Sequence, residues 1–130
     1  MKLTNNFSKS EFDCKSGEEM PLDVLENVKL LAIQLQKIRD YVGKPIRINS
    51  AYRSEAHNEA IGGVKTSQHI LGKAADITID TFTPDEVVSI IENMLTNEML
   101  GGFYIGGLGS YNTFTHIDIR DKQARWNFKK

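Results

Sequence analysis

The longest hydrophobic pattern in the chain is helical. Between residues 21 and 42, apolar side chains recur at intervals of three and four residues, which places them on one face of an amphipathic helix. These positions are Leu22, Leu25, Val28, Leu31, Leu35, Ile38 and Val42. Pro21 is favourable at the start of a helix, and Gly43 is favourable just after its end. The pattern therefore predicts a scaffold helix that begins at Pro21 and ends near Val42.

Shorter segments alternate between apolar and polar residues, which is typical of strands with one buried face. Such alternation occurs at residues 46–49, 75–79 and 113–120. A further strand is predicted at 103–105, where it would lead into a turn over the glycine-rich residues 106–109. Each of these segments predicts a strand with one face toward the core.

Two shorter helices complete the pattern. Residues 55–61 predict a short helix, and the glycine pair that follows ends it. Thr83 and Glu86 form a capping box around Pro84, so a second helix is expected from there to about residue 95. The order of the elements predicts an α+β fold, with an antiparallel sheet flanked by helices, in a single domain over residues 1–130.

Length, charge and cysteine content narrow the functional class. The chain has 130 residues, enough for one domain with a real core, and a formal net charge of −1 with its basic residues scattered. We therefore expect no nucleic-acid partner. Cys14 is the only cysteine, so no internal disulfide can form, and residues 1–10 contain no apolar signal segment. We expect a monomer made in the cytoplasm, without a signal peptide and without a membrane span.

The stretch 66–77 carries the clearest candidate chemistry. It contains His69 and Asp76, seven positions apart, with Gly72 between them. A two-residue loop at Gly72 and Lys73 suits a type II′ hairpin turn, which requires glycine first. In that register His69 is directly opposite Asp76, and the two side chains share one face. The predicted hairpin would thus present an imidazole and a carboxylate to one point, as two ligands of a zinc site.

A third ligand is expected from the strand at 113–120. The isoleucines of this strand point into the core, so His116 and Asp118 point to the opposite face, toward a cleft. Two histidines and one carboxylate leave a fourth tetrahedral position for water, which is typical of a catalytic rather than a structural zinc. On the pattern alone a metal-free alternative stays open, in which these histidines and the aspartate are ordinary surface or half-buried residues.

The full set of motifs resembles a known family. Ser67-x-His69-x6-Asp76 followed by His116-x-Asp118 is similar to the pattern of the zinc D-Ala-D-Ala carboxypeptidases, peptidase family M15, and most of all to its short single-domain branch of bacteria and phages. The other matches are Phe7-Ser8-x-Ser10-Glu11-Phe12-x-Cys14, Ala51-Tyr52-Arg53-Ser54 with Ala51 in place of the usual glycine, His57-Asn58, Gly62-Gly63 and Gly72-Lys73-Ala74-Ala75-Asp76. The resemblance covers nearly the whole chain and implies a fold like that of hedgehog and D-Ala-D-Ala peptidases, with Zn²⁺ on His69, Asp76 and His116. It also implies a zinc-dependent metallopeptidase that hydrolyses peptide bonds in peptidoglycan stem peptides, as a D,D-carboxypeptidase or an endopeptidase.

The resemblance further implies roles for residues beside the metal. Arg53 would contact the substrate near the scissile bond, because its planar donors suit a carboxylate or an oxyanion; the alternative is a structural arginine that holds the chain corner through backbone carbonyls. Ser67 would hydrogen-bond a substrate carbonyl or amide, unless it is an ordinary strand serine. Relatives often carry an acidic residue or a histidine three positions before the last ligand, where this chain has Thr113. Asp118 is then the candidate for the general base, with orientation of a ligating histidine or pairing with an arginine as alternatives.

Several nearby residues are assigned no chemistry. Gln68 alternates away from the site face of the predicted hairpin, and His57 is interpreted as a surface or structural residue. Tyr52 and Tyr104 are candidates for either the groove or the core. The C-terminal tail, which contains the only tryptophan, is expected to pack back on the body.

Three functional hypotheses follow. The resemblance, together with a short chain that shows no export signal, indicates a phage or prophage lysin that acts on the cell wall through lysis machinery or from a virion. Thr113, which cannot act as a base at neutral pH, motivates a second hypothesis of a zinc-holding module that binds the cell wall without turnover. The third is a metal-free structural domain of a phage particle, which bound zinc would exclude.

Overall fold

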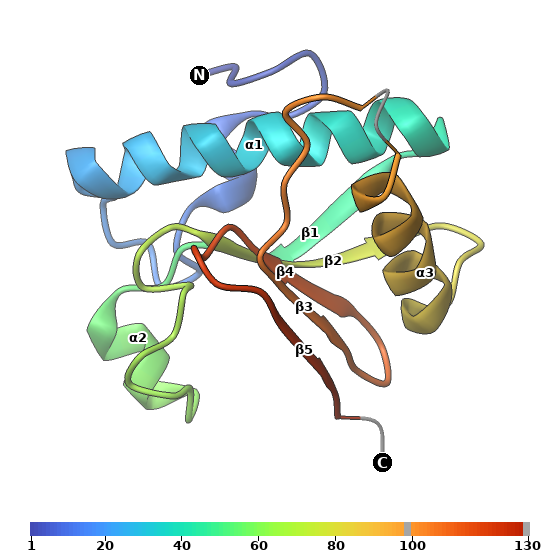
Figure 1. Cartoon of the computed structure of the whole chain (residues 1–130). Coiled ribbons are helices and arrows are strands. Elements are labelled where there is room, and N and C mark those ends of the chain that lie inside the picture. The colour runs from blue at the N-terminus through green and yellow to red at the C-terminus, as the bar shows by residue number, and fades with distance from the viewer. Residues whose placement is uncertain (98–99, 129–130) are drawn as a thin grey trace.

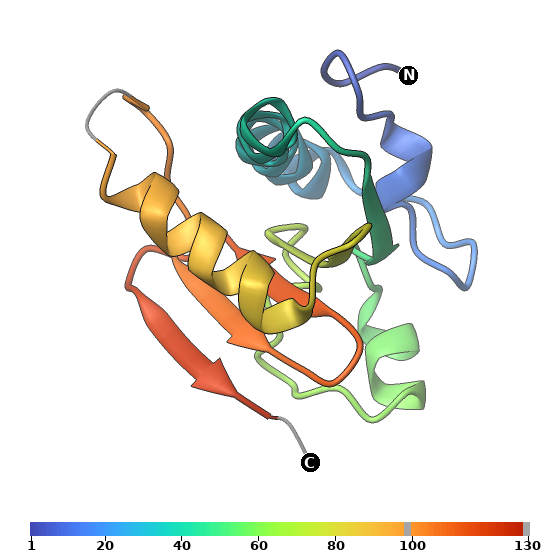
Figure 2. The same cartoon turned by 90° about the vertical axis from the view of Figure 1, so that its right-hand side faces the viewer.

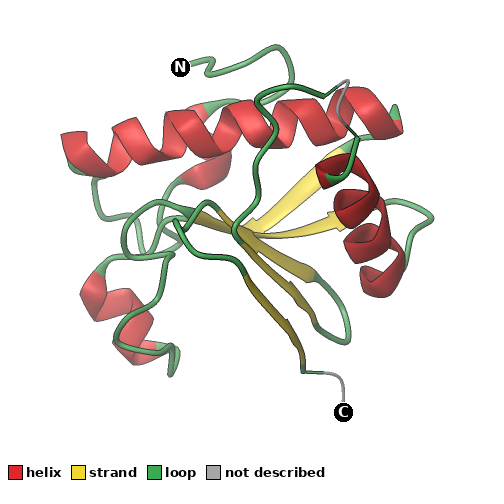
Figure 3. Cartoon of the chain, in the orientation of Figure 1, coloured by secondary structure: helices red, strands yellow, loops and turns green. Residues whose placement is uncertain are grey.

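The computed structural model describes residues 1–97 and 100–128. Its helical elements are η1 (Lys9–Phe12), α1 (Leu22–Val42), α2 (Glu55–Ala60) and α3 (Pro84–Leu95). Its strands are β1 (Ile46–Ser50), β2 (Ala74–Ile79), β3 (Gly107–Ser110), β4 (Thr115–Asp118) and β5 (Ala124–Asn127). Figure 3 shows the strands gathered between the helices, and the predicted α+β class is confirmed.

The strands form one sheet in the order β1-β2-β4-β3-β5. The pairs β1–β2, β2–β4 and β4–β3 are antiparallel, whereas β3 and β5 are parallel, so the prediction of an antiparallel sheet fails only at this edge. The tail packs back on the body, as predicted, by adding β5 to β3. Both views show α1 and α3 beside the sheet, and in Figure 1 the sheet lies between α2 and α3 (Figure 1, Figure 2).

Helix α1 follows its hydrophobic pattern closely. Gly43 ends the helix in the left-handed region, at φ 69°, and its N–H donates to the carbonyl of Arg39 at 3.0 Å. The buried side chains of α1 are Val24, Leu25, Val28, Leu31, Ala32, Leu35 and Ile38. Leu22 departs from the pattern, because it occupies the first helical position and is 81% exposed. Within the described part of the chain, no helix is both long enough and apolar enough to cross a membrane.

Helix α3 begins with the predicted capping box. The Thr83 hydroxyl accepts from the N–H of Glu86 at 3.2 Å, and the Glu86 carboxylate accepts from the N–H of Thr83 at 2.8 Å. Pro84 occupies the first helical position, where its missing N–H costs nothing. The residues that α3 buries are Val87, Ile91 and Met94. The capping box lies within four consecutive residues of the sequence, and the helix that it predicted is confirmed.

Alternation along the strands gives the sheet an apolar face and a polar face. Ile77, Leu108 and Ile117 are buried in one hydrophobic core together with α1 and α3. Asp76 and His116 directly precede two of these residues, so they point to the opposite face. The two long helices therefore support the sheet from behind, and the candidate site lies on the other side.

The predicted hairpin around Gly72 is wrong. Residues 69–71 lie in consecutive turns, in which the N–H of Lys73 donates to Gln68 O at 3.1 Å and that of Gly72 to His69 O at 3.2 Å. This bonding pattern terminates a helical turn, with Gly72 in the left-handed region at φ 74°. Strand β2 has β1 on one side and β4 on the other, so it has no free edge for a hairpin partner.

The glycine-rich segment also differs from the prediction. Residues 103–105 form no strand, and β3 instead occupies most of the stretch that was predicted to turn. A side chain at Gly107 would overlap the carboxylate of Asp118, and a side chain at Gly109 would overlap the indole of Trp126. Glycine is required at both positions because side chains from the neighbouring strands occupy the space that a Cβ atom would take.

Candidate metal centre

One row of residues crosses the five strands on the face that carries the candidate ligands. The register aligns Ser50, Asp76, His116, Gly109 and Trp126, from β1 to β5. Directly paired residues point to the same face, so the row places the carboxylate of Asp76 beside the imidazole of His116. Strand pairing, rather than a hairpin turn, therefore positions two of the three predicted ligands.

His69 reaches the same point from the loop that follows α2. Its carbonyl accepts from the N–H of Arg53 at 3.1 Å, and its Nδ1 is 2.7 Å from the carbonyl oxygen of Ala51. Gly72 packs so closely on α1 that a Cβ there would lie 2.7 Å from Cγ1 of Val24. The loop is thus held both by the corner after β1 and by α1, and His69 is fixed between these two attachments.

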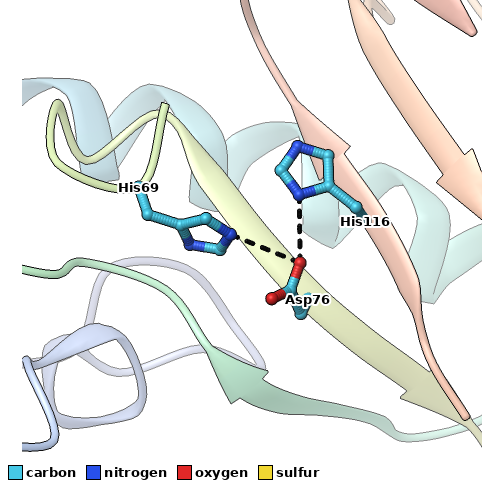
Figure 4. Close-up of side chains that lie close together, drawn as sticks. All are labelled: His69, Asp76 and His116. Carbon is cyan, nitrogen blue, oxygen red and sulfur yellow. Dashed lines mark hydrogen bonds and ion pairs between the residues drawn. The ribbon is translucent and has the colours of Figure 1, made fainter. Parts of the chain in front are cut away.

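The side chains of His69, Asp76 and His116 converge (Figure 4). Oδ1 of Asp76 is 3.3 Å from Nε2 of His69 and 3.0 Å from Nδ1 of His116. One possible ligand atom from each residue lies within 4.8 Å of the other two, and all three residues are buried. The structure therefore brings together the three residues that were predicted to bind the metal.

The outer nitrogen of each imidazole is already engaged. A carbonyl oxygen can only accept, so Nδ1 of His69 donates to Ala51 and Nε2 is left as the ligand atom. Nε2 of His116 is 2.8 Å from Oδ2 of Asp118, and its Nδ1 faces Asp76. Two imidazoles held by outer oxygen acceptors, together with one carboxylate, form a ligand set that suits Zn²⁺. The donor set therefore fits the expected zinc cofactor.

The cluster shifts the pKa of two of its members. Burial alone would raise the pKa of the Asp76 carboxyl, but hydrogen bonds and charges from His116 and His69 hold it well below its usual range. Burial alone would lower the pKa of His116, but hydrogen bonds to Asp118 and Asp76 raise it. The carboxylate is therefore ionised at neutral pH, and protons compete with a cation for His116.

Asp118 is fully buried beside His116 and is not among the described residues that line the cavity over the ligands. Its Oδ1 accepts from the N–H of Gly107 at 2.8 Å and from Nε of Arg120 at 2.9 Å, and its Oδ2 accepts from Nη2 of Arg120 at 2.7 Å. Burial would raise the pKa of this carboxyl, but hydrogen bonds from His116 and Arg120 hold it well below its usual range. The geometry matches the alternative in which Asp118 orients a ligating histidine.

Arg53 and Ser67 both line the cavity. Nη2 of Arg53 is 3.3 Å from Oδ2 of Asp76, and its other donors contact the side-chain oxygens of Asn58 and Ser50. These contacts differ from the backbone contacts expected of an arginine that only holds the corner. Ser67 lies between two turns rather than in a strand, and its Oγ accepts from the N–H of His69 at 3.1 Å.

The cavity over the ligands has a volume of about 590 Å³. Gln68 lines it, contrary to the prediction, because its segment turns instead of alternating as a strand. Tyr52 and Tyr104 are not among the described lining residues. Tyr52 is part of the hydrophobic core, and the hydroxyl of Tyr104 donates to the carbonyl of Arg120 at 2.6 Å.

An aromatic wall of the cavity was missed by the sequence analysis. It consists of Tyr111, Phe114, Trp126 and Phe128. The rings of Tyr111 and Phe114 stack with centroids 4.4 Å apart, and the ring of Trp126 lies 5.1 Å from that of His116. The usable signal was the two-residue spacing of Trp126 and Phe128, which places both side chains on one face of a strand.

Thr113 lies outside this cavity. It is exposed and borders a small cavity beside α3, together with Pro84 and Val87. Apart from the three ligands, the described lining residues of the main cavity include no carboxylate and no imidazole. An ordinary general base is therefore supplied neither by Thr113 nor by the described lining of the main cavity.

Comparison with known proteins places the chain in a family. The family model for Peptidase M15 matches residues 5–118. A zinc D-Ala-D-Ala carboxypeptidase from Streptomyces albus G is 29% identical over 106 residues, which is 81% of this chain and 40% of the relative. The chain therefore spans less than half of that relative's length. Since the family model covers most of the sequence, the chain belongs to peptidase family M15.

Proposed function

We propose that this chain is a zinc-dependent peptidase that hydrolyses peptide bonds in the stem peptides of peptidoglycan. The observation that carries the proposal is the convergence of His69, Asp76 and His116 at a cavity large enough to receive a peptide segment. Family membership and the name of the Streptomyces relative support it. Zinc bound to these residues would polarise a carbonyl and supply a water that ionises near neutral pH.

Arg53 and Ser67 are the proposed substrate contacts. The guanidinium of Arg53 lies beside the ligand Asp76, and its planar donors suit a substrate carboxylate or the oxygen of a scissile carbonyl. The oxygen of Ser67 accepts the N–H of His69, so the hydroxyl proton is available to a substrate carbonyl. These two residues would fix the peptide on the polar side of the cavity.

For Asp118 we propose a positioning role rather than the role of general base. Its carboxylate is fully buried and accepts from His116, Arg120 and the backbone of Gly107. A carboxylate that holds the outer nitrogen of a ligating histidine fixes the direction of the ligand and raises its basicity. The geometry therefore favours an effect of Asp118 on the metal through His116.

The test is mass spectrometry of purified sacculi and defined stem peptides after incubation with zinc-loaded protein. New fragments that disappear with a chelator would support the proposal, and their masses would distinguish D,D-carboxypeptidase from endopeptidase cleavage. His116→Ala should abolish turnover, whereas His57→Ala, which changes a histidine outside the metal cluster, should retain it. Intact substrates with one zinc bound per chain would contradict the proposal.

A zinc-holding module that binds the cell wall without turnover is the second candidate. The specific observation in its favour is the described lining, which holds no carboxylate or imidazole besides the three ligands. Such a module would sediment with sacculi and carry zinc, yet it would release no fragments. The sacculus experiment therefore separates the two functions directly.

The hypothesis of a phage or prophage lysin is a finer proposal. Expression of the chain in a host together with a holin should lyse the cells, and the His116→Ala variant should not. Cells that stay intact while the purified protein cleaves sacculi would overturn the lysin role and leave the peptidase function standing.

A further inference from the structure

Few groups in the cavity can transfer a proton. Peptide hydrolysis needs such a group, because the amine that leaves must be protonated. Besides the metal ligands, the described lining residues with polar side chains are Arg53, Thr66, Ser67, Gln68, Tyr111, Arg120 and Trp126. Arginine does not lose its proton in proteins, and aliphatic hydroxyl, amide and indole groups are very weak acids. The phenol of Tyr111 is the one side chain of this set that is suited to proton donation.

Tyr111 lies next to Trp126, the residue of the aromatic wall that contacts a metal ligand. It follows β3 two residues after Gly109, which lies in the same cross-strand row as His116. The ring of Trp126 lies 5.1 Å from that of His116, and Nε1 of Trp126 donates to the phenolic oxygen of Tyr111 at 3.0 Å. On its other side the ring of Tyr111 stacks on Phe114, with 13° between the planes. The ring of Phe128 is also close, with its centroid 5.6 Å from that of Tyr111. One indole therefore connects the phenol to a metal ligand, and three aromatic neighbours fix its position.

The hydrogen bond from Trp126 also determines which atom of the phenol is available. An indole N–H can only donate, so the phenolic oxygen is the acceptor and its own proton is not used in this bond. Within the described residues no other hydrogen bond uses the hydroxyl of Tyr111. The proton is therefore available to a group bound in the cavity, which Tyr111 lines.

We propose that Tyr111 donates the proton to the leaving amine, a role that rests on the peptidase function proposed above. Water adds its hydroxyl to the carbonyl carbon, and the C–N bond breaks with its electron pair on nitrogen. The phenolic proton goes to that nitrogen, and the remaining proton of the water returns to the phenolate. One water is consumed, Tyr111 is regenerated, and no oxidant, reductant or further reactant is needed.

The test compares Tyr111→Phe with the wild type on two substrates that differ only at the scissile bond. One is a stem peptide with an amine leaving group, and the other is the matching thioester, whose thiolate leaves without protonation. For the peptide, kcat should fall about 100- to 10,000-fold while KM changes less than about threefold. For the thioester, kcat should stay within about threefold, because that step needs no proton donor. Bound zinc should be unchanged, and Tyr41→Phe, a matched control on the exposed side of α1, should behave as the wild type.

A second variant keeps the test decisive if the first one folds poorly. Trp126→Phe leaves an aromatic ring beside His116 but removes the N–H that holds the phenol, so it should show the same selective loss on the peptide to a smaller extent. If both variants slow peptide and thioester equally, or slow neither, the proton-donor role is overturned and the peptidase function stands. If the wild type cleaves neither compound, the peptidase function is overturned and the role of Tyr111 with it.

Discussion

Replacement of Asp118 by asparagine tests how this buried carboxylate acts on the metal site. Among the described residues, every hydrogen-bond partner of the Asp118 carboxylate is a donor: Nε2 of His116, the guanidinium and backbone N–H of Arg120, and the backbone N–H of Gly107. An asparagine of the same shape offers one acceptor oxygen and one NH₂ group. Because Asp118 has no exposed surface, that NH₂ group must face one of these donors without relief from water.

The expected loss can be worked from these contacts. Partners that hold a ligating histidine typically contribute about 10- to 100-fold in metal affinity, so the zinc Kd of Asp118→Asn should rise by that factor, about 1.4–2.7 kcal/mol. The free energy of unfolding should fall by about 3 kcal/mol, the low end for a broken buried ion pair. The low end applies because the side chain of Arg120 is 31% exposed, and water can reach its freed guanidinium.

The assay is competition for zinc with a chromophoric chelator, followed by turnover at saturating zinc. Asp80→Asn, an exposed aspartate just after β2, is the matched control and should leave zinc affinity unchanged. If Asp118 positions His116, affinity falls as stated and much of kcat returns at saturating zinc. A Kd within about twofold of the wild type, with kcat reduced more than about 100-fold, would refute this reasoning and indicate a general base.

Three further predictions follow from the backbone and the ligands. Gly109→Ala should push the indole of Trp126 away from His116 and lower the free energy of unfolding by about 1–3 kcal/mol in a urea titration. An unchanged urea midpoint would contradict the close packing of Trp126 on Gly109. Gly72→Ala and Gly43→Ala both place a side chain on left-handed backbone, at a cost of about 1–2 kcal/mol each. Only the new side chain at position 72 would also collide with α1, so Gly72→Ala should be the less stable of the two variants in a urea titration. Equal losses of stability would exclude the close approach of Gly72 to α1. In zinc-free protein kept in chelator, the lowered pKa of Asp76 stabilises the fold above about pH 4, and this stabilisation is lost as pH falls. The raised pKa of His116 stabilises the fold below about pH 6.5, and this stabilisation is lost as pH rises. Urea midpoints of the zinc-free protein should therefore be higher at pH 5 than at pH 8, with the difference reduced by zinc, and a flat profile would contradict the ionic cluster.

Local signals predicted the helices well. The spacing of apolar residues in α1, its end at Gly43 and the capping box of Thr83 and Glu86 all depend on contacts within a few residues along the chain. Such contacts are present in the sequence itself, so these elements and their bounds could be predicted closely. The alternation of apolar and polar residues is likewise present in the sequence itself, and it identified strands β1, β2 and β4.

The candidate ligands could be identified from the sequence, but the way they meet could not. His69, Asp76 and His116 were selected by residue type and by resemblance, and the structure brings them together. The hairpin that was expected to join His69 to Asp76 does not exist, because β2 already pairs on both sides. Pairing across a sheet depends on strands far apart in sequence, and a local pattern of turn residues cannot show which edge of a strand is taken.

The aromatic wall makes the same point for the residues that were missed. The glycines of β3 suggested a bend, since glycine inside a strand pattern is ambiguous between a turn and a close approach. Only the parallel pairing of β5 with β3 places Trp126 opposite Gly109, and only the missing side chain at Gly109 allows the indole to reach His116. Gly109 and Trp126 therefore work as one unit, although they lie on different strands and neither can be interpreted without the other. The phenol of Tyr111 depends on the same unit through the N–H of Trp126, so the proposed proton donor could be found only once the order of the strands was known.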